Sequence, residues 1–188
     1  MKTLLGILLF ASPLFAQDQA AAARAAAGCG PSEVKFTVKT DKAQHPMAQP
    51  TPGKAIVYVF GGQDIDLGGF VIGKEGVMTR WAIDGVWVGA GYRNSYFFFS
   101  VDPGDHHLCA GRQAYSKALA AFSFTAEAGK SYYFRTTSRL SAKRPDYDSA
   151  VKELEPVNPA AAQLLIADSP FTTFQRKESK EPQDSSSD

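Results

Sequence analysis

The sequence lacks the features that mark several large classes of protein. It has no uninterrupted apolar stretch of the ~20 residues that a membrane-spanning helix requires. Its formal net charge is only +1 at pH 7, and acidic and basic residues are interspersed. Nucleic-acid binding needs a basic face that neutralises phosphates, and a membrane-surface anchor needs a polybasic run. We therefore expect no nucleic-acid partner, no membrane span and no polybasic anchor.

Sequence motifs of common enzymes are also missing. The chain has no G-x-S-x-G motif for a serine nucleophile and no G-x-x-x-x-G-K-[ST] loop for nucleotide phosphates. The three histidines, His45, His106 and His107, lie in or beside β-type sequence without a surrounding motif. We therefore expect a protein that is not an enzyme and that uses no cofactor.

The stretch around His106 and His107 contains residue types that bind zinc, because Cys109 follows closely and His45 could join them. Successive side chains of a strand point to opposite faces of the sheet. His107 would then share a face with Cys109, and His106 with Leu108. Two ligands at most converge, whereas a structural zinc ion takes four. We expect no metal site, and the candidate ligands, were there one, would be His106 and His107.

The N-terminal residues 1–16 predict a secretory signal peptide. Lys2 is followed by an apolar segment at 4–10, and Ala16 offers a small residue at the cleavage site. Residues 17–30 are rich in alanine and are interpreted as a leader to the domain. The expected location is the periplasm or the extracellular space.

The two cysteines, Cys29 and Cys109, favour a disulfide, because an even number of cysteines in an exported chain is typically paired. Two separate thiols are one alternative. A lipid anchor on Cys29 is another, since residues 26–29 (AAGC) are somewhat like a lipobox. Arg24 and the distance from the apolar segment count against the lipid anchor.

Several segments predict β-strands. Residues 34–39 alternate apolar and polar side chains, as in a half-buried strand, and residues 55–60 (AIVYVF) predict a strand buried on both faces. Asp84-Gly85 between residues 77–83 and 86–89 is a strong hairpin signal.

Further turns predict two more hairpins and one helix. Residues 102–105 (DPGD) would pair segment 106–111 with 95–101, and residues 127–130 would pair 131–137 with 119–126. Residues 151–157 favour a last strand. The segment 158–167 predicts a helix, with Asn158 as its cap and Pro159 in its first turn.

Together these segments predict one domain over residues 31–174, followed by a disordered tail over 175–188. The expected fold is mainly β: an antiparallel β-sandwich, or a partly open barrel, of about 7–9 strands with one short C-terminal helix. Residues 95–101 (SYFFFSV) place aromatic side chains on both faces of a strand. A second layer, either the helix or a partner, must therefore cover one of these faces.

Five motifs in order resemble those of a known family. They are residues 53–59 (GKAIVYV), 83–89 (IDGVWVG), 94–97 (NSYF), 101–106 (VDPGDH) and 128–135 (AGKSYYFR). As a set they resemble a family of uncharacterised exported bacterial proteins and lipoproteins, a domain-of-unknown-function family, and more distantly the PEGA domain. The resemblance implies a β-sandwich in the cell envelope or outside the membrane, with no known catalytic residues to carry over.

The resulting functional hypothesis is an exported, non-catalytic binding protein whose partner is an envelope protein or a glycan. Its loops 61–76 and 139–148 would be displayed to that partner. Aromatic side chains that stack on sugars or enter interfaces would be Tyr92, Tyr96 and Trp87. The alternatives are a structural or assembly accessory protein of the envelope and, least favoured, a metal-dependent enzyme using the His106/His107 region.

Overall fold

The computed structural model describes residues 29–30, 34–62, 65–66, 71–72, 78–113, 119–139 and 151–177. The expected signal peptide (1–16), nearly all of the leader (17–30), residues 140–148 of the loop 139–148 and residues 178–188 lie outside these ranges. Most of the loop 61–76 does as well.

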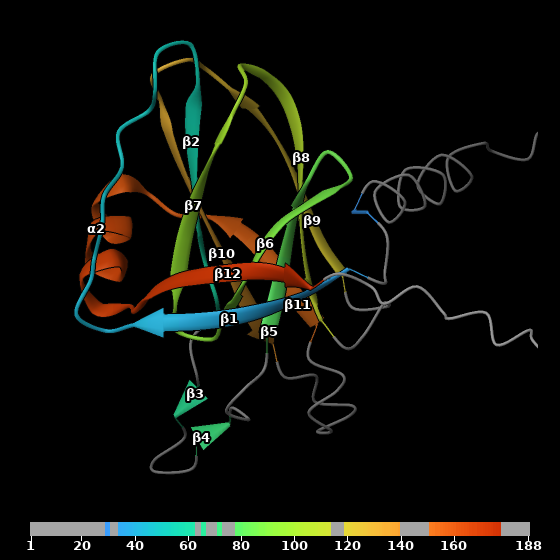
Figure 1. The fold of residues 1–188 in the computed structure, drawn as a ribbon, viewed down its shortest axis with the longest axis vertical. Helices are drawn as coiled ribbons and strands as arrows, with labels where there is room; N and C mark the ends of the chain where they lie inside the picture. Colours follow the sequence, from blue (N-terminus) through green and yellow to red (C-terminus); the bar gives the residue numbers. More distant parts are fainter. Residues whose placement is uncertain are drawn as a thin grey trace, which may run out of the picture.

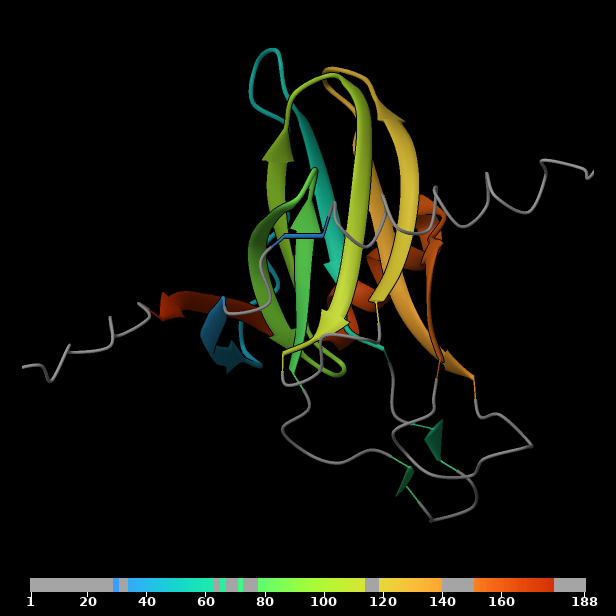
Figure 2. The ribbon, with the colours of Figure 1, turned by 90° about the vertical axis from the view of Figure 1, so that its right-hand side faces the viewer.

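Two β-sheets packed face to face form the domain (Figures 1 and 2). The six-stranded sheet has the order β1 (Lys35–Asp41), β12 (Phe171–Lys177), β7 (Tyr96–Val101), β2 (Ala55–Phe60), β10 (Ser131–Arg139), β11 (Val151–Pro156). The four-stranded sheet has the order β6 (Val86–Tyr92), β5 (Met78–Ile83), β8 (Gly104–Arg112), β9 (Leu119–Ala126). A separate two-stranded sheet pairs β3 (Ile65–Asp66) with β4 (Val71–Ile72). The predicted β-sandwich with one short C-terminal helix is confirmed, and the two main sheets contain ten strands rather than about seven to nine.

Strand β2 is buried along its whole length, as its apolar sequence predicts. Val57 and Val59 face the space between the two sheets, where they belong to the same cluster as Trp81 and Leu108 of the other sheet. The alternate side chains of β2 point to the outer face of the six-stranded sheet. The strand therefore needs a cover on that outer face too.

Helix α2 (Pro159–Asp168) provides this cover and lies against the outer face of the six-stranded sheet (Figure 1). Its Ala162 and Ile166 are buried against Tyr58 and its neighbours. The helix begins as predicted, because the Asn158 side chain accepts a hydrogen bond from the Ala161 N–H at 2.9 Å and Pro159 follows.

Replacing Asn158 with alanine is expected to lower the free energy of unfolding by about 1 kcal/mol, because the first turn of α2 loses the acceptor for one of its N–H groups. Urea denaturation of the full chain measures this. The matched control is Gln163→Ala, an exposed position of the same helix. Equal midpoints for N158A and the wild type would show that the cap adds no stability.

The hairpin β5–β6 forms as the Asp84-Gly85 signal predicts. Both residues have positive φ, 49° and 81°, which is the requirement of a type I′ turn. This turn places the Asp84 carboxylate at the tip of the hairpin, next to the start of β8.

The two other predicted hairpins are wrong. Strand β7 pairs with β2 and β12, whereas β8 pairs with β5 and β9 in the other sheet. In the same way β9 and β10 belong to different sheets. Residues 102–103 and 127–130 therefore connect the two layers at one end of the sandwich, where both views show them crossing (Figures 1 and 2). Because they cross, the apolar faces of consecutive strands meet each other across the core between the two sheets.

These crossings also make the larger sheet mixed rather than antiparallel. Strand β10 runs parallel to β2, and β12 has a short parallel contact with β7 at Phe171 and Tyr96. The four-stranded sheet is antiparallel throughout, in agreement with the prediction.

Strand β12 is absent from the strands predicted from the sequence. The prediction of a disordered tail from residue 175 is wrong for residues 175–177, which belong to this strand. The strand pairs along its whole length with β1 to form a two-stranded ribbon, here called the β1–β12 ribbon. The ribbon lies across β7 and β6 (Figure 1). Its Phe174 fits against Gly89 of β6 so closely that a Cβ on this glycine would stand 2.5 Å from the Phe174 ring. The ribbon thus covers one side of the sandwich.

Candidate functional site

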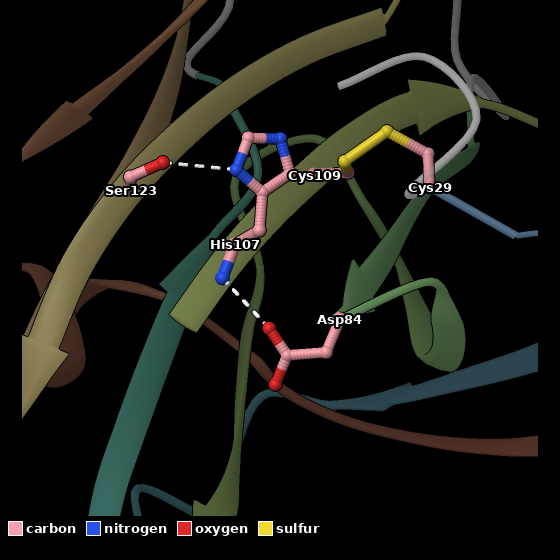
Figure 3. Close-up of a disulfide and its surroundings, with 5 residues drawn as sticks. All are labelled: Cys29, Asp84, His107, Cys109 and Ser123. Atoms are coloured by element: carbon pink, nitrogen blue, oxygen red, sulfur yellow. Dashed lines mark hydrogen bonds between the residues drawn. A yellow bond between two sulfur atoms is a disulfide. The ribbon is translucent and has the colours of Figure 1, made fainter. Parts of the chain in front are cut away.

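Cys29 and Cys109 form the predicted disulfide, which joins the segment before β1 to β8 (Figure 3). Both residues are at most 1% exposed, and they pack with Trp87 and Phe36. A cysteine whose sulfur is in a disulfide cannot also carry the thioether of a lipid, so the alternative of a lipid anchor on Cys29 is wrong. Within the described residues, no helix has the length and apolar character needed to cross a membrane.

The side chain of His107 lies on the same strand as Cys109, two residues before it (Figure 3). Its Nδ1 is 2.9 Å from the hydroxyl of Ser123, its cross-strand partner on β9. Its main-chain N–H donates to Oδ1 of Asp84 at 2.8 Å. The carboxylate of Asp84 therefore holds the backbone of His107 and not its ring.

The other oxygen of Asp84 holds His106. The Nδ1 of His106 is 2.6 Å from Asp84 Oδ2, and its Nε2 is 2.7 Å from the main-chain oxygen of Asp102. Both partners are acceptors, so the doubly protonated ring satisfies the geometry best. Burial lowers the pKa of His106, but the hydrogen bonds to Asp102 and Asp84, with their negative charges, outweigh it and raise the pKa above its usual value.

This arrangement predicts a pH-dependent contribution of His106 to stability. A raised folded-state pKa stabilises the protein fully below the unfolded pKa of about 6.5, and this stabilisation is lost as pH rises through the folded pKa. The difference in unfolding free energy between the wild type and H106Q is therefore expected to be larger at pH 5.5 than at pH 8.5. Urea denaturation at both values measures it, and a difference that grows with pH would contradict the assignment. Ring-proton NMR of the wild type provides the pKa directly.

The third histidine lies far from the other two in the fold. His45 Nδ1 is 2.8 Å from the main-chain oxygen of Ile166 and 3.1 Å from that of Ser169, at the end of α2. The idea that His45 joins His106, His107 and Cys109 around zinc is thus wrong, since Cys109 is also in the disulfide. In the part of the chain that the structure describes, no group of three or more histidine, cysteine or acidic residues is placed to hold a metal ion.

Two of the three aromatic residues proposed for partner contacts are part of the core. Tyr96 is fully buried and donates its hydroxyl to the Pro46 oxygen at 3.0 Å, and burial raises its pKa to about 12. Trp87 is 5% exposed, with the guanidinium of Arg80 4.2 Å above its ring. Tyr92 is half-buried. Tyr96 and Trp87 therefore cannot meet a partner in the folded domain.

The β1–β12 ribbon presents an exposed polar face that the sequence reasoning missed. Three cross-strand pairs of this face, here called the ribbon face, are exposed on both strands: Lys35, Thr37 and Lys39 of β1, and Thr173, Gln175 and Lys177 of β12. A hollow of about 190 Å³ opens between them, lined by Thr37, Lys39, Thr173, Phe174 and Gln175. The polar half of the alternation in residues 34–39 was a visible signal for one strand of it, but β12 was not recognised.

Compared with protein-family models, with curated proteins and with solved structures, the chain matches none. The resemblance to exported bacterial proteins of a domain-of-unknown-function family accordingly stays a prediction. What the structure establishes is a β-sandwich closed by a disulfide between Cys29 and Cys109.

Proposed function

We propose that the protein is an exported, non-catalytic binding module that acts in the cell envelope or the extracellular space on a glycan or protein partner. The observation that carries the proposal is the buried Cys29–Cys109 disulfide. Disulfides of this kind form and persist in oxidising compartments, as in the periplasm or outside the cell. The signal-like residues 1–16 point in the same direction.

The arrangement of the polar groups supports binding rather than catalysis. The histidine rings contact three different parts of the fold: the end of α2, the tip of the β5–β6 hairpin and Ser123 of β9. A Ser-His-Asp triad needs a carboxylate on the ring of the histidine that contacts the serine. Asp84 bonds the ring of His106 instead, while Ser123 contacts His107. Exposed polar side chains gather on the ribbon face, which is open to large ligands.

Export and oxidation are tested together by intact mass spectrometry of the full chain expressed in a bacterium with an active secretion pathway. The expected product is found outside the cytoplasm, lacks residues 1–16, and is two hydrogens lighter than its reduced form. An unprocessed and reduced chain in the cytoplasm would refute the export part of the proposal.

Binding is tested by presenting this exported protein to a glycan array and by cross-linking it in intact cells. Saturable binding to a glycan, or to one envelope protein as a separable partner, is the expected result. Stoichiometric recovery within a stable envelope assembly, without glycan binding, would instead favour the structural accessory role.

A further inference from the structure

We propose that the ribbon face binds a negatively charged polysaccharide chain, an inference that rests on the proposed function and names its ligand. The ribbon face carries three lysines, Lys35, Lys39 and Lys177, and all three are exposed. Asp41 follows Lys39 on the same face at the end of β1, and its exposed carboxylate accepts a hydrogen bond from the Ala43 N–H at 2.8 Å. Among the described residues, the three lysines have no acidic partner within ion-pair distance.

The register of the ribbon places two of these positive charges directly opposite each other. Lys35 of β1 is the cross-strand partner of Lys177 of β12. Like charges at directly opposite positions destabilise a β-ribbon. An anionic group that lies between the two ammonium groups would remove this repulsion, so the pair favours a negatively charged ligand.

The third lysine extends the positive charge along the strand and past the hollow. Lys39 is four residues from Lys35, which corresponds to roughly 13 Å along an extended strand and so to a few sugar units. The hollow of about 190 Å³ lies beside Lys39 and is lined by hydroxyl and amide side chains with Phe174. Pockets that enclose a whole small ligand measure roughly 300–1,000 Å³. The hollow therefore suits one unit of a longer chain, with hydroxyl groups that Thr37, Thr173 and Gln175 can bond.

At residues 34–36 the β1 edge of the ribbon is closed to an added strand, which argues against a partner that binds there by β-augmentation. The side chain of Gln113 accepts from the Phe36 N–H at 2.7 Å and donates to the Phe36 oxygen at 3.1 Å. Next to it, Arg80 Nη1 donates to the Val34 oxygen at 2.6 Å. Side chains thus occupy the main-chain groups at this end of β1, so a ligand bound beside Lys35 lies on the face and not along this edge.

The composition of the face distinguishes a polysaccharide from other polyanions. A single-stranded nucleic acid is bound through exposed aromatic rings that stack on its bases, and the ribbon face has none. A membrane surface is bound by exposed apolar side chains that enter the lipid. The large apolar side chains exposed in the described residues, Met47, Val86 and Leu164, lie on other elements.

The test is a calorimetric titration of the oxidised full chain with oligogalacturonate, a chain of carboxylated sugars, at low and high salt. A neutral oligoglucan of the same length, phosphatidylglycerol vesicles and a DNA oligomer serve as comparison ligands. The variant K35Q/K39Q/K177Q is expected to bind oligogalacturonate about tenfold more weakly than the wild type, because three exposed charge contacts are lost. Salt is expected to weaken wild-type binding, and the neutral chain is expected not to bind.

A pair of single variants controls for total charge. K39Q removes a charge from the ribbon face, whereas K130Q removes one from the exposed turn that connects β9 to β10. K39Q should weaken binding and K130Q should leave it unchanged, and thermal unfolding checks that both variants are folded.

Several outcomes would overturn the assignment. If the triple variant binds oligogalacturonate as the wild type does, the glycan site lies elsewhere while the proposed binding function stands. If the triple variant loses vesicle or DNA binding by the same factor as oligogalacturonate binding, the face is a general polyanion surface and the polysaccharide assignment is wrong. Absence of oligogalacturonate binding to the wild type refutes the ligand, and the export and cross-linking experiments then decide separately on the proposed function.

Discussion

Replacement of Cys29 and Cys109 by alanine is expected to lower the free energy of unfolding by about 4 kcal/mol, since the disulfide closes a long loop in the unfolded chain. The two cysteines are 80 residues apart in sequence, and the bridge restricts all of the chain between them. Differential scanning calorimetry should show a melting temperature lower by about 10 °C for a domain of this size. Urea denaturation measures the free energy itself.

Reducing agent supplies the control for this prediction. With the disulfide reduced, the wild type should unfold at nearly the same urea concentration as C29A/C109A. If the double variant keeps the stability of the oxidised wild type, the bridge does not stabilise the domain.

Replacement of Trp81 by alanine is expected to cost about 3–5 kcal/mol, because it leaves a cavity where the two sheets meet. Trp81 is 1% exposed and lies in the middle of β5, between Gly89 of β6 and Ala110 of β8. It packs with Val57, Phe97 and Leu108 in the main core cluster. These two cross-strand neighbours, Gly89 and Ala110, are too small to fill the space that the indole ring leaves. Equilibrium denaturation with urea measures the loss.

Val86→Ala is the matched control for this substitution. Val86 is in the same hairpin as Trp81 but is 59% exposed, so its truncation should change stability by no more than about 0.5 kcal/mol. A W81A protein with near wild-type stability would mean that this part of the core is filled in another way.

Local signals in the sequence were sufficient for the elements whose conformation a few residues determine. The Asp84-Gly85 pair specifies a type I′ turn through its positive φ angles, and Asn158 and Pro159 specify where the helix begins. The continuous apolar run of β2 specified burial on both faces. In each of these cases the cause lies within about six neighbouring residues.

The assignment of strands to sheets was not predictable in the same way. Pro103 and Gly104 specify a change of direction, but they do not determine whether the next strand pairs with the last one or crosses to the other layer. That choice depends on how much apolar surface distant segments bury together. Strand β12 was not predictable for the same reason. Its short sequence forms a strand because it pairs with β1, which is distant in the sequence.

Exposure of individual aromatic residues also depended on packing that the sequence does not reveal. The aromatic segment 95–101 was expected to need a cover on its second face, and helix α2 provides it. Tyr96 is buried there with Ile166 of the helix and bonded to Pro46 of a distant loop. Trp87 is buried because the segment around Cys29 crosses the outer face of the smaller sheet. The ribbon face could be located only after this packing was known.

The pairing of the first strand with the last has a consequence for the order in which the domain matures. Thr37 of β1 contacts Gln175 of β12 across 138 residues of sequence. A chain that leaves the ribosome or a translocation channel N-terminus first presents β1 long before β12 emerges. Contacts of such long range form late, after the loop between them has been ordered. The ribbon is therefore completed only when the chain up to residue 177 has been delivered, and a chain truncated before residue 171 would leave β1 without the strand that it pairs with.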